Sequence, residues 1–170
     1  TVSQNSAYAY ECVTNERKTF FPKDISNGVK LTHKDYTVTL RPNSPINSDA
    51  KNEKAIILPS KVEIEEEDYA QYTNDFGEKT TLQYSPTNQG VKENLVLDEY
   101  TGQNEFGYIM NAEGLEPKET EGTTITFIDS TTKAEVLKVK ETFVYDSRYT
   151  EDSGNENAIS YNNYYKVQEQ

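Results

Sequence analysis

The sequence predicts an all-β fold: an antiparallel β-sandwich or a strongly twisted β-meander of about ten or eleven short strands with little helix. Many short runs alternate apolar and polar residues at period two, which is typical of strands with one buried face. Turn-forming residues separate these runs at intervals of about 8–12 residues. The large apolar residues include 13 Tyr and 6 Phe but no Trp, and aromatic residues of this kind favour strands.

The expected strands follow one another along the whole chain. They cover residues 28–31, 35–42, 54–59, 60–65, 79–86, 91–100, 105–110, 123–129, 134–139, 142–146 and 158–167. Sequences such as SNG, SPTNQG and DSTTK lie between them and contain the residues that turns require. The segment EIEEEDYAQY at residues 63–72 has helix-forming residues for one or two turns, but its apolar residues do not recur at helical spacing.

Two stretches predict hairpins. Residues 90–106 combine an alternating strand with a polar turn at residues 100–104, where Gly102 can take a positive φ angle. Phe106 and Tyr108 then share one face of the expected return strand. Residues 123–139 show the same pattern around a DSTTKA turn, so we expect a second hairpin there.

Composition limits the classes of function. The formal net charge is −12, whereas nucleic-acid binding requires a basic surface that releases counterions, so we expect no nucleic-acid partner. No run of 18 apolar residues exists, so we expect no membrane insertion. Only 34% of the residues are hydrophobic, which favours a thin core with much solvated surface. The length of 170 residues predicts one domain, or at most two small ones, and we expect a single β-rich module spanning residues 1–170.

Cysteine usage is compatible with secretion. Cys12 is the only cysteine, so no internal disulfide can form, and its alternating context predicts a buried or half-buried small side chain. Secreted proteins of Gram-positive bacteria often lack cysteine, so the count does not favour the cytosol. The chain begins with polar residues, and we expect any export signal to lie upstream or to have been removed.

Catalytic signals are weak. His33 is the only histidine and lies in a polar strand-to-turn corner, which is typical of a surface histidine. The densest group of acids, at residues 63–68, is predicted to form a solvent-exposed face. Adjacent like charges do not provide two carboxyl groups that face each other across a cleft, as glycosidase chemistry requires. Walker, dinucleotide and nucleophile-elbow motifs are absent. We therefore expect no catalytic residue and no enzyme activity.

Two sets of residues are candidates for binding. Tyr161, Tyr164 and Tyr165 cluster near the end of the chain and could present planar rings to a ligand such as a glycan, although tyrosines at this spacing are more often strand packing.

Oxygen-bearing side chains also gather in the segment DSRYTEDSGNEN. Asp146, Glu151 and Asp152 could hold a calcium ion, although their spacing fits no EF-hand loop and a plain loop is the alternative. Calcium is the only cofactor that this pattern suggests.

Part of the sequence resembles a known family. The stretch YTNDFGEKTTLQYSPTNQGVKENLVLDEYTGQNEF is similar to a segment of large cell-surface proteins of Firmicutes, the wall-associated RHS-repeat proteins and relatives carrying DNRLRE-type domains. The resemblance covers roughly residues 70–150. It rests on Tyr72, Asn74, Phe76, Tyr84, Gly90 to Glu93, Leu95, Leu97, Asn104 to Phe106, and the later pair Tyr145 and Asp146. Where the family commonly has a proline before the last aromatic strand, this chain has KVKETF.

The resemblance implies an extracellular or wall-associated β-rich module within a longer protein, and it implies no catalytic residue. We therefore expect a non-catalytic structural or interaction module that acts as a spacer, scaffold or docking surface. The alternative is a carbohydrate- or ligand-binding β-sandwich module, assisted by calcium. The expected partners are neighbouring modules of the same polypeptide, other cell-surface components, and glycans.

Overall fold

The computed structural model describes residues 7–14, 17–43, 56–57, 69–73, 76–149 and 156–168. The chain divides into two compact units, which are Thr1–Glu113 (unit 1) and Gly114–Gln170 (unit 2). Each unit has its own antiparallel sheets, so each is described by itself.

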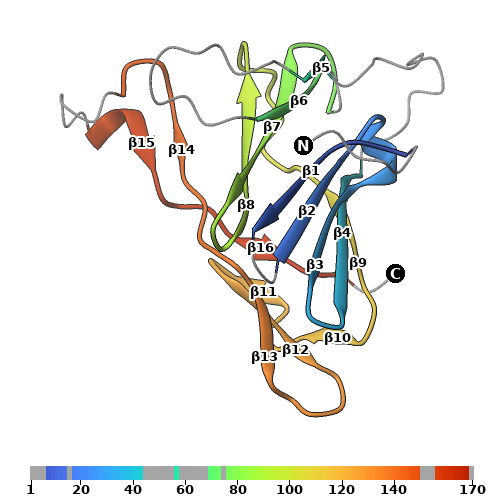
Figure 1. Ribbon diagram of the computed structural model, residues 1–170. Coiled ribbons are helices and arrows are strands. Elements are labelled where there is room, and N and C mark those ends of the chain that lie inside the picture. Colours follow the sequence, from blue (N-terminus) through green and yellow to red (C-terminus); the bar gives the residue numbers. More distant parts are fainter. Residues whose placement is uncertain are drawn as a thin grey trace. The chain divides into compact units, whose positions relative to one another are not determined.

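Unit 1 contains two antiparallel sheets, drawn in blue to yellow in Figure 1. The first sheet has the strand order β1-β2-β3-β4-β9, with β1 (Tyr8–Thr14), β2 (Arg17–Pro22), β3 (Val29–His33), β4 (Tyr36–Pro42) and β9 (Tyr108–Ala112). The second has the order β5-β6-β7-β8, with β5 (Ile56–Ile57), β6 (Ala70–Thr73), β7 (Thr80–Thr87) and β8 (Gly90–Leu97). A short 3-10 turn, η1 (Ile25–Asn27), connects β2 to β3.

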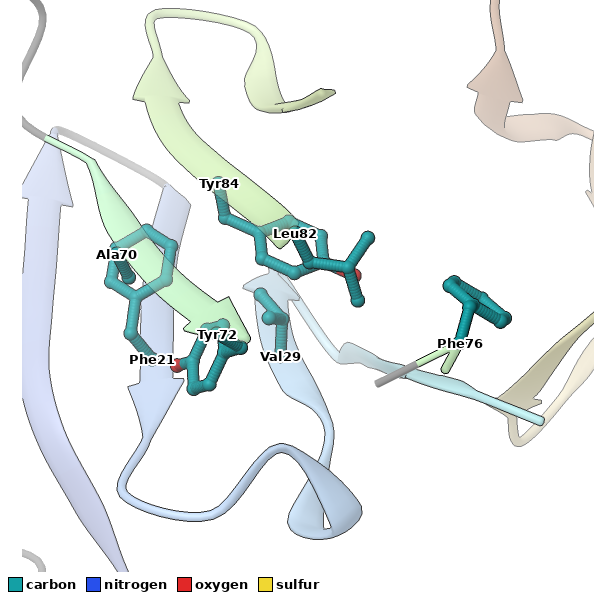
Figure 2. Close-up of a cluster of buried hydrophobic side chains, with 7 residues drawn as sticks. All are labelled: Phe21, Val29, Ala70, Tyr72, Phe76, Leu82 and Tyr84. Carbon is teal, nitrogen blue, oxygen red and sulfur yellow. The ribbon is translucent and has the colours of Figure 1, made fainter. Parts of the chain in front are cut away.

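The two sheets of unit 1 pack their apolar faces together. Figure 2 shows side chains of β6 and β7 directed toward side chains of β2 and β3. Alternation along β7 explains this arrangement, because Thr80, Leu82 and Tyr84 are buried while the residues between them are only half-buried. The buried cluster consists of Phe21, Val29, Ala70, Tyr72, Phe76, Leu82 and Tyr84. Unit 1 is therefore a β-sandwich with an aromatic-rich core.

Polar and aromatic contacts also join the two sheets. The Tyr72 hydroxyl of β6 donates a hydrogen bond of 2.8 Å to the Pro22 carbonyl oxygen of β2. The Phe76 ring meets the Phe106 and Tyr108 rings edge-on, with centroids 5.3 and 5.2 Å away. Edge-to-face packing at this separation is favourable for aromatic pairs.

Unit 2 is built from smaller sheets. A three-stranded sheet has the order β10-β12-β13, with β10 (Leu115–Pro117), β12 (Ile125–Asp129) and β13 (Glu135–Val139). Two-residue strands form two ribbons, which pair β11 (Glu121–Gly122) with β16 (Tyr165–Lys166) and β14 (Val144–Tyr145) with β15 (Ile159–Ser160). A second 3-10 turn, η2 (Glu156–Ala158), precedes β15. Ile125, Phe127 and Ala158 are the buried apolar side chains among its described residues.

The predicted all-β fold class is confirmed, since the regular secondary structure of the described residues consists of antiparallel strands and two 3-10 turns. The hairpin predicted at residues 123–139 is also confirmed, because β12 pairs with β13. Asp129 closes its turn by accepting hydrogen bonds from the backbone N–H groups of Thr131 and Thr132.

The hairpin predicted from residue 90 onward is wrong. β8 pairs with β7, and β9 pairs with β4, so the two strands belong to different sheets. Gly102 does take a positive φ of 82°, but the segment around it crosses between sheets. The local pattern predicts the bend correctly and cannot select the pairing partner, because strand pairing is a long-range contact.

Other expectations have mixed outcomes. The helical alternative for residues 63–72 fails at its end, because Ala70–Thr73 forms strand β6, whereas residues 63–68 lie outside the described residues. The strand predicted at residues 60–65 also lies outside them. The expected strands did not include β1, β2, β6, β10 or β11. That both units act as one module stays a prediction.

Within the described ranges, no helix is long and apolar enough to cross a lipid bilayer.

Candidate functional site

An aromatic surface lies on the β14–β15 ribbon of unit 2. We define this aromatic surface as Phe143, Tyr145, Tyr149 and Tyr161. The Phe143 ring stacks on Tyr145 at a centroid distance of 6.0 Å and meets Tyr161 at 5.9 Å, while Tyr145 meets Tyr149 at 5.7 Å. The four rings therefore form one continuous series of contacts.

These rings remain accessible to solvent. Phe143, Tyr145 and Tyr161 are 48%, 56% and 67% exposed. A two-residue ribbon is too short to bury rings on both of its faces, which explains the exposure. Exposed large aromatic residues in contact with one another indicate an interaction site more strongly than single exposed residues do.

A hollow of about 220 Å³ lies beside the aromatic surface. It is lined by both strands of the ribbon and by η2, and its walls include Tyr145, Asp146, Asn157 and Ser160. One aromatic residue, Tyr145, and several hydrogen-bonding residues thus line the same hollow.

The three tyrosines predicted as a ligand platform have different environments. Tyr161 belongs to the aromatic surface, and Tyr164 is 66% exposed. Tyr165 lies in β16, and its hydroxyl donates a hydrogen bond of 3.0 Å to the Lys140 carbonyl oxygen. The structure adds Phe143, Tyr145 and Tyr149, which the sequence pattern did not select because they are distant from Tyr161 along the chain. Ligand binding by these residues stays a prediction.

The predicted calcium ligands are only partly described. Both Asp146 carboxylate oxygens accept hydrogen bonds from the Arg148 guanidinium group, at 2.5–3.1 Å. The bonds from Arg148 hold the pKa of the Asp146 carboxyl below its usual range. Glu151 and Asp152 lie outside the described residues. Among the described residues, no group of three or more acidic, histidine or cysteine side chains is placed to hold a metal ion.

His33, predicted to be a surface histidine, and Cys12, predicted to be a buried or half-buried small side chain, are both half-buried. His33 ends β3 and pairs with Tyr36 across the β3–β4 turn. Cys12 lies in β1 as a free thiol, half-buried as predicted. A polar hollow of about 220 Å³ on unit 1 is lined by side chains of the β4 and β9 region, including Asp35 and Glu113.

Unit 1 contains a buried carboxyl group that the sequence did not lead us to predict. Glu93 lies in β8 directly opposite Tyr84 of β7, and its Oε1 accepts a 2.5 Å hydrogen bond from the Tyr108 hydroxyl of β9. The sequence does contain a signal for the burial of Glu93. Strand alternation places Glu93 on the same face as Val91 and Leu95, which pack against the core.

Two polar atoms in this cluster lack partners. Within the described part of the chain, neither Glu93 Oε2 nor the Tyr84 hydroxyl has a hydrogen-bond partner, and both atoms are buried. Burial raises the pKa of the Glu93 carboxyl, while the hydrogen bond from Tyr108, and secondarily the nearby Tyr84 hydroxyl, oppose that rise. Burial first, and the neighbouring Glu93 charge second, raise the pKa of the Tyr84 hydroxyl.

Comparison with known proteins finds three similar Bacillus proteins. The tRNA(Glu)-specific nuclease WapA of Bacillus subtilis subsp. natto (strain BEST195) is 33% identical over 141 residues. The tRNA nuclease WapA of Bacillus subtilis (strain 168) is 32% identical over 145 residues. The tRNA3(Ser)-specific nuclease WapA of Bacillus spizizenii (strain DSM 15029 / JCM 12233 / NBRC 101239 / NRRL B-23049 / TU-B-10) is 32% identical over 141 residues.

Each match covers 79% of this chain but only 6% of the relative. The chain therefore corresponds to a small segment of those large proteins. No family model matches the chain, and no solved structure matches it.

These names overturn three expectations. The prediction of a non-catalytic spacer, scaffold or docking module, with its carbohydrate- or ligand-binding alternative, is wrong because the relatives are named as nucleases. The prediction that the protein is not an enzyme is wrong for the same reason. The prediction of partners without nucleic acid is wrong because the named substrates are tRNAs. Net charge and missing motifs describe only this segment, and they do not exclude an activity of a much longer protein.

Proposed function

We propose that the chain is a β-rich segment of an extracellular or wall-associated tRNA-cleaving protein of the WapA kind. The match to three proteins named as tRNA nucleases, over 79% of the chain, is the observation that supports this function. The resemblance to wall-associated RHS-repeat proteins supports the location. Relatives named for different tRNAs match this chain at 32–33% identity, so the match favours no particular tRNA.

The test is a cleavage assay with the natural full-length polypeptide that contains this chain. Incubation with end-labelled total tRNA is expected to yield discrete fragments of one or a few tRNA species. The matched control is the same polypeptide after heat denaturation. Intact tRNA throughout, with a polypeptide shown to be folded by circular dichroism, contradicts the proposal.

We also propose that the aromatic surface of unit 2 contacts unpaired bases of the RNA. Unpaired RNA bases stack on aromatic side chains and form hydrogen bonds at their edges. The aromatic surface offers exposed rings beside Asp146, Asn157 and Ser160. Each stacked base is worth about 1–3 kcal/mol in such sites.

The net negative charge of the chain limits which interactions can bind RNA. Because the chain has a net charge of −12, phosphate contacts contribute little and stacking must supply the affinity. We therefore expect weak binding whose dependence on salt concentration is shallow.

Titration of the chain with a single-stranded RNA heptamer, followed by NMR, tests this contact. Tyr161→Ala is expected to weaken binding about tenfold, the equivalent of one lost stacking contact of about 1.4 kcal/mol. Tyr100→Ala is the matched control, because Tyr100 is 86% exposed and lies in unit 1. Equal weakening by both substitutions, or equal affinity for a neutral polysaccharide, contradicts base recognition at the aromatic surface.

A further inference from the structure

Glu93 lies between three strands of unit 1. Its backbone belongs to β8, the outermost strand of the second sheet, and it is the cross-strand neighbour of Tyr84 on β7. Its carboxyl oxygen Oε1 accepts the Tyr108 hydroxyl hydrogen from β9, which belongs to the first sheet. One side chain thus connects the two sheets of the sandwich.

The carboxyl group of Glu93 is buried, with one of its oxygens bonded to Tyr108 and the other without a partner in the described part of the chain. An ionised carboxylate only accepts hydrogen bonds, and leaving a buried acceptor without a donor costs about 1–3 kcal/mol or more. Glu93 Oε2 and the Tyr84 hydroxyl are the two buried side-chain polar atoms without a partner in the described part of the chain. The Tyr84 hydroxyl can donate to Oε2 of the carboxylate, and a protonated Oε2 could donate to the Tyr84 oxygen instead, so protonation removes the buried charge without removing this pairing.

The surroundings offer no charge that compensates the carboxylate. The groups facing Glu93 are the Tyr84 hydroxyl from β7 and the Tyr108 hydroxyl from β9, and Tyr72 of β6 lies beyond Tyr84 at a ring distance of 6.1 Å. No cationic side chain among the described residues contributes to the pKa of Glu93, which burial raises. An uncompensated buried carboxyl group favours its neutral form.

We propose that Glu93 is a proton-controlled tie between the two sheets of unit 1. When solvent supplies a proton to Oε2, neutral Glu93 links Tyr84 and Tyr108 in one hydrogen-bonded chain from β7 through β8 to β9. When the proton leaves, the carboxylate can still accept hydrogen bonds from the tyrosine hydroxyls, but it is a buried charge with no cation beside it, and this favours opening of β8. β8 is suited to open because it is an edge strand, paired only with β7 among the described strands.

The direction of the pH effect follows from linkage. The folded chain binds the Glu93 proton more readily than the unfolded chain does, because the pKa is raised on folding. The stabilisation is complete below the ordinary carboxyl pKa and is lost as pH rises to the raised value. Across that interval, the opening equilibrium of β8 should increase about tenfold per pH unit.

Amide hydrogen exchange of the 170-residue chain at several pH values, corrected for intrinsic exchange rates, tests this tie. Protection of β8 amides is expected to decrease as pH rises in the natural chain. Glu93→Gln, which keeps the shape and stays neutral, is expected to remove this dependence. Glu105→Gln, at an exposed acid of unit 1, is the control and should behave like the natural chain. Identical pH profiles for the natural chain and Glu93→Gln overturn the proposal.

A direct titration covers the case in which Glu93→Gln does not fold. Carbon-13 NMR of the natural chain should show the Glu93 carboxyl titrating above the ordinary value of about 4.3. Tyr108→Phe removes a hydrogen bond to the carboxyl and should move the midpoint further upward. A midpoint at or below the ordinary value overturns the proposal. Because the tie is independent of RNA cleavage, failure of either proposal leaves the other intact.

Discussion

Tyrosines of the two units differ in their exposure to solvent. In unit 1, Tyr84 is fully buried and Tyr72 lies edge-on against it in the sandwich core. In unit 2, Tyr145 and Tyr161 pack on Phe143 but stay more than half exposed. The difference arises from the sheets, because a four-stranded sheet facing a five-stranded sheet covers its rings and a two-residue ribbon does not. Aromatic content alone therefore does not distinguish a core from a binding surface.

The largest expected effect tests whether unit 1 depends on its core. Leu82→Ala removes a side chain that is 1% exposed, and should lower the free energy of unfolding by about 2–5 kcal/mol. Leu97→Ala is the matched control, since Leu97 is 36% exposed on the neighbouring strand and should cost much less. Urea unfolding followed by circular dichroism measures both. Similar losses for the two variants would show that the sandwich interior is not the main source of stability.

The next effect concerns the tight approach of η1 to β4. Gly28 has φ 75°, and a Cβ atom there would clash with Thr39 Cγ2. Gly28→Ala should therefore cost about 1–3 kcal/mol, measured by urea unfolding. Gly102→Ala separates clash from backbone strain, because Gly102 has φ 82° but open space around its Cβ position. If both substitutions cost the same, strain alone accounts for the loss.

A smaller loss of stability is expected when a tyrosine hydroxyl group is removed, and the loss should differ between the two units. Tyr72→Phe removes a buried hydrogen bond to Pro22 and leaves that carbonyl oxygen without its donor, at a cost of about 1–2 kcal/mol. Tyr165→Phe removes a hydrogen bond to Lys140 that is exposed to water, so it should cost less. Thermal unfolding measures both. A larger loss for Tyr165→Phe would contradict the contrast drawn between the units.

The smallest expected effect is on the stability of unit 2. Tyr161→Ala should change the free energy of unfolding by less than about 0.5 kcal/mol, because the ring is mostly exposed. Phe127→Ala, in the core of the same unit, provides the contrast and should be strongly destabilising. Chemical unfolding of the two variants under the same conditions measures both changes in the free energy of unfolding. A large loss with Tyr161→Ala would show that the aromatic surface supports folding, which would weaken its interpretation as a binding surface.

The sequence predicted part of the candidate site. It selected Tyr161, Tyr164 and Asp146 from local clustering, and the structure places Tyr161 on the aromatic surface and Asp146 on the wall of the adjacent hollow. It did not select Phe143 or Tyr145, because residues that meet through pairing of β14 with β15 are separated along the chain. It also missed Glu93, whose burial depends on a tyrosine from the opposite sheet.

By itself, the sequence determined the all-β class, the net negative charge and which residues of the expected strands share a face, because alternation at period two is a local property. Only the tertiary structure decided that β8 and β9 join different sheets. It also decided that Glu93 lies against Tyr84 and Tyr108, and that Tyr161 remains in solvent. Those outcomes depend on which distant strand supplies the covering face, and no local pattern carries that information.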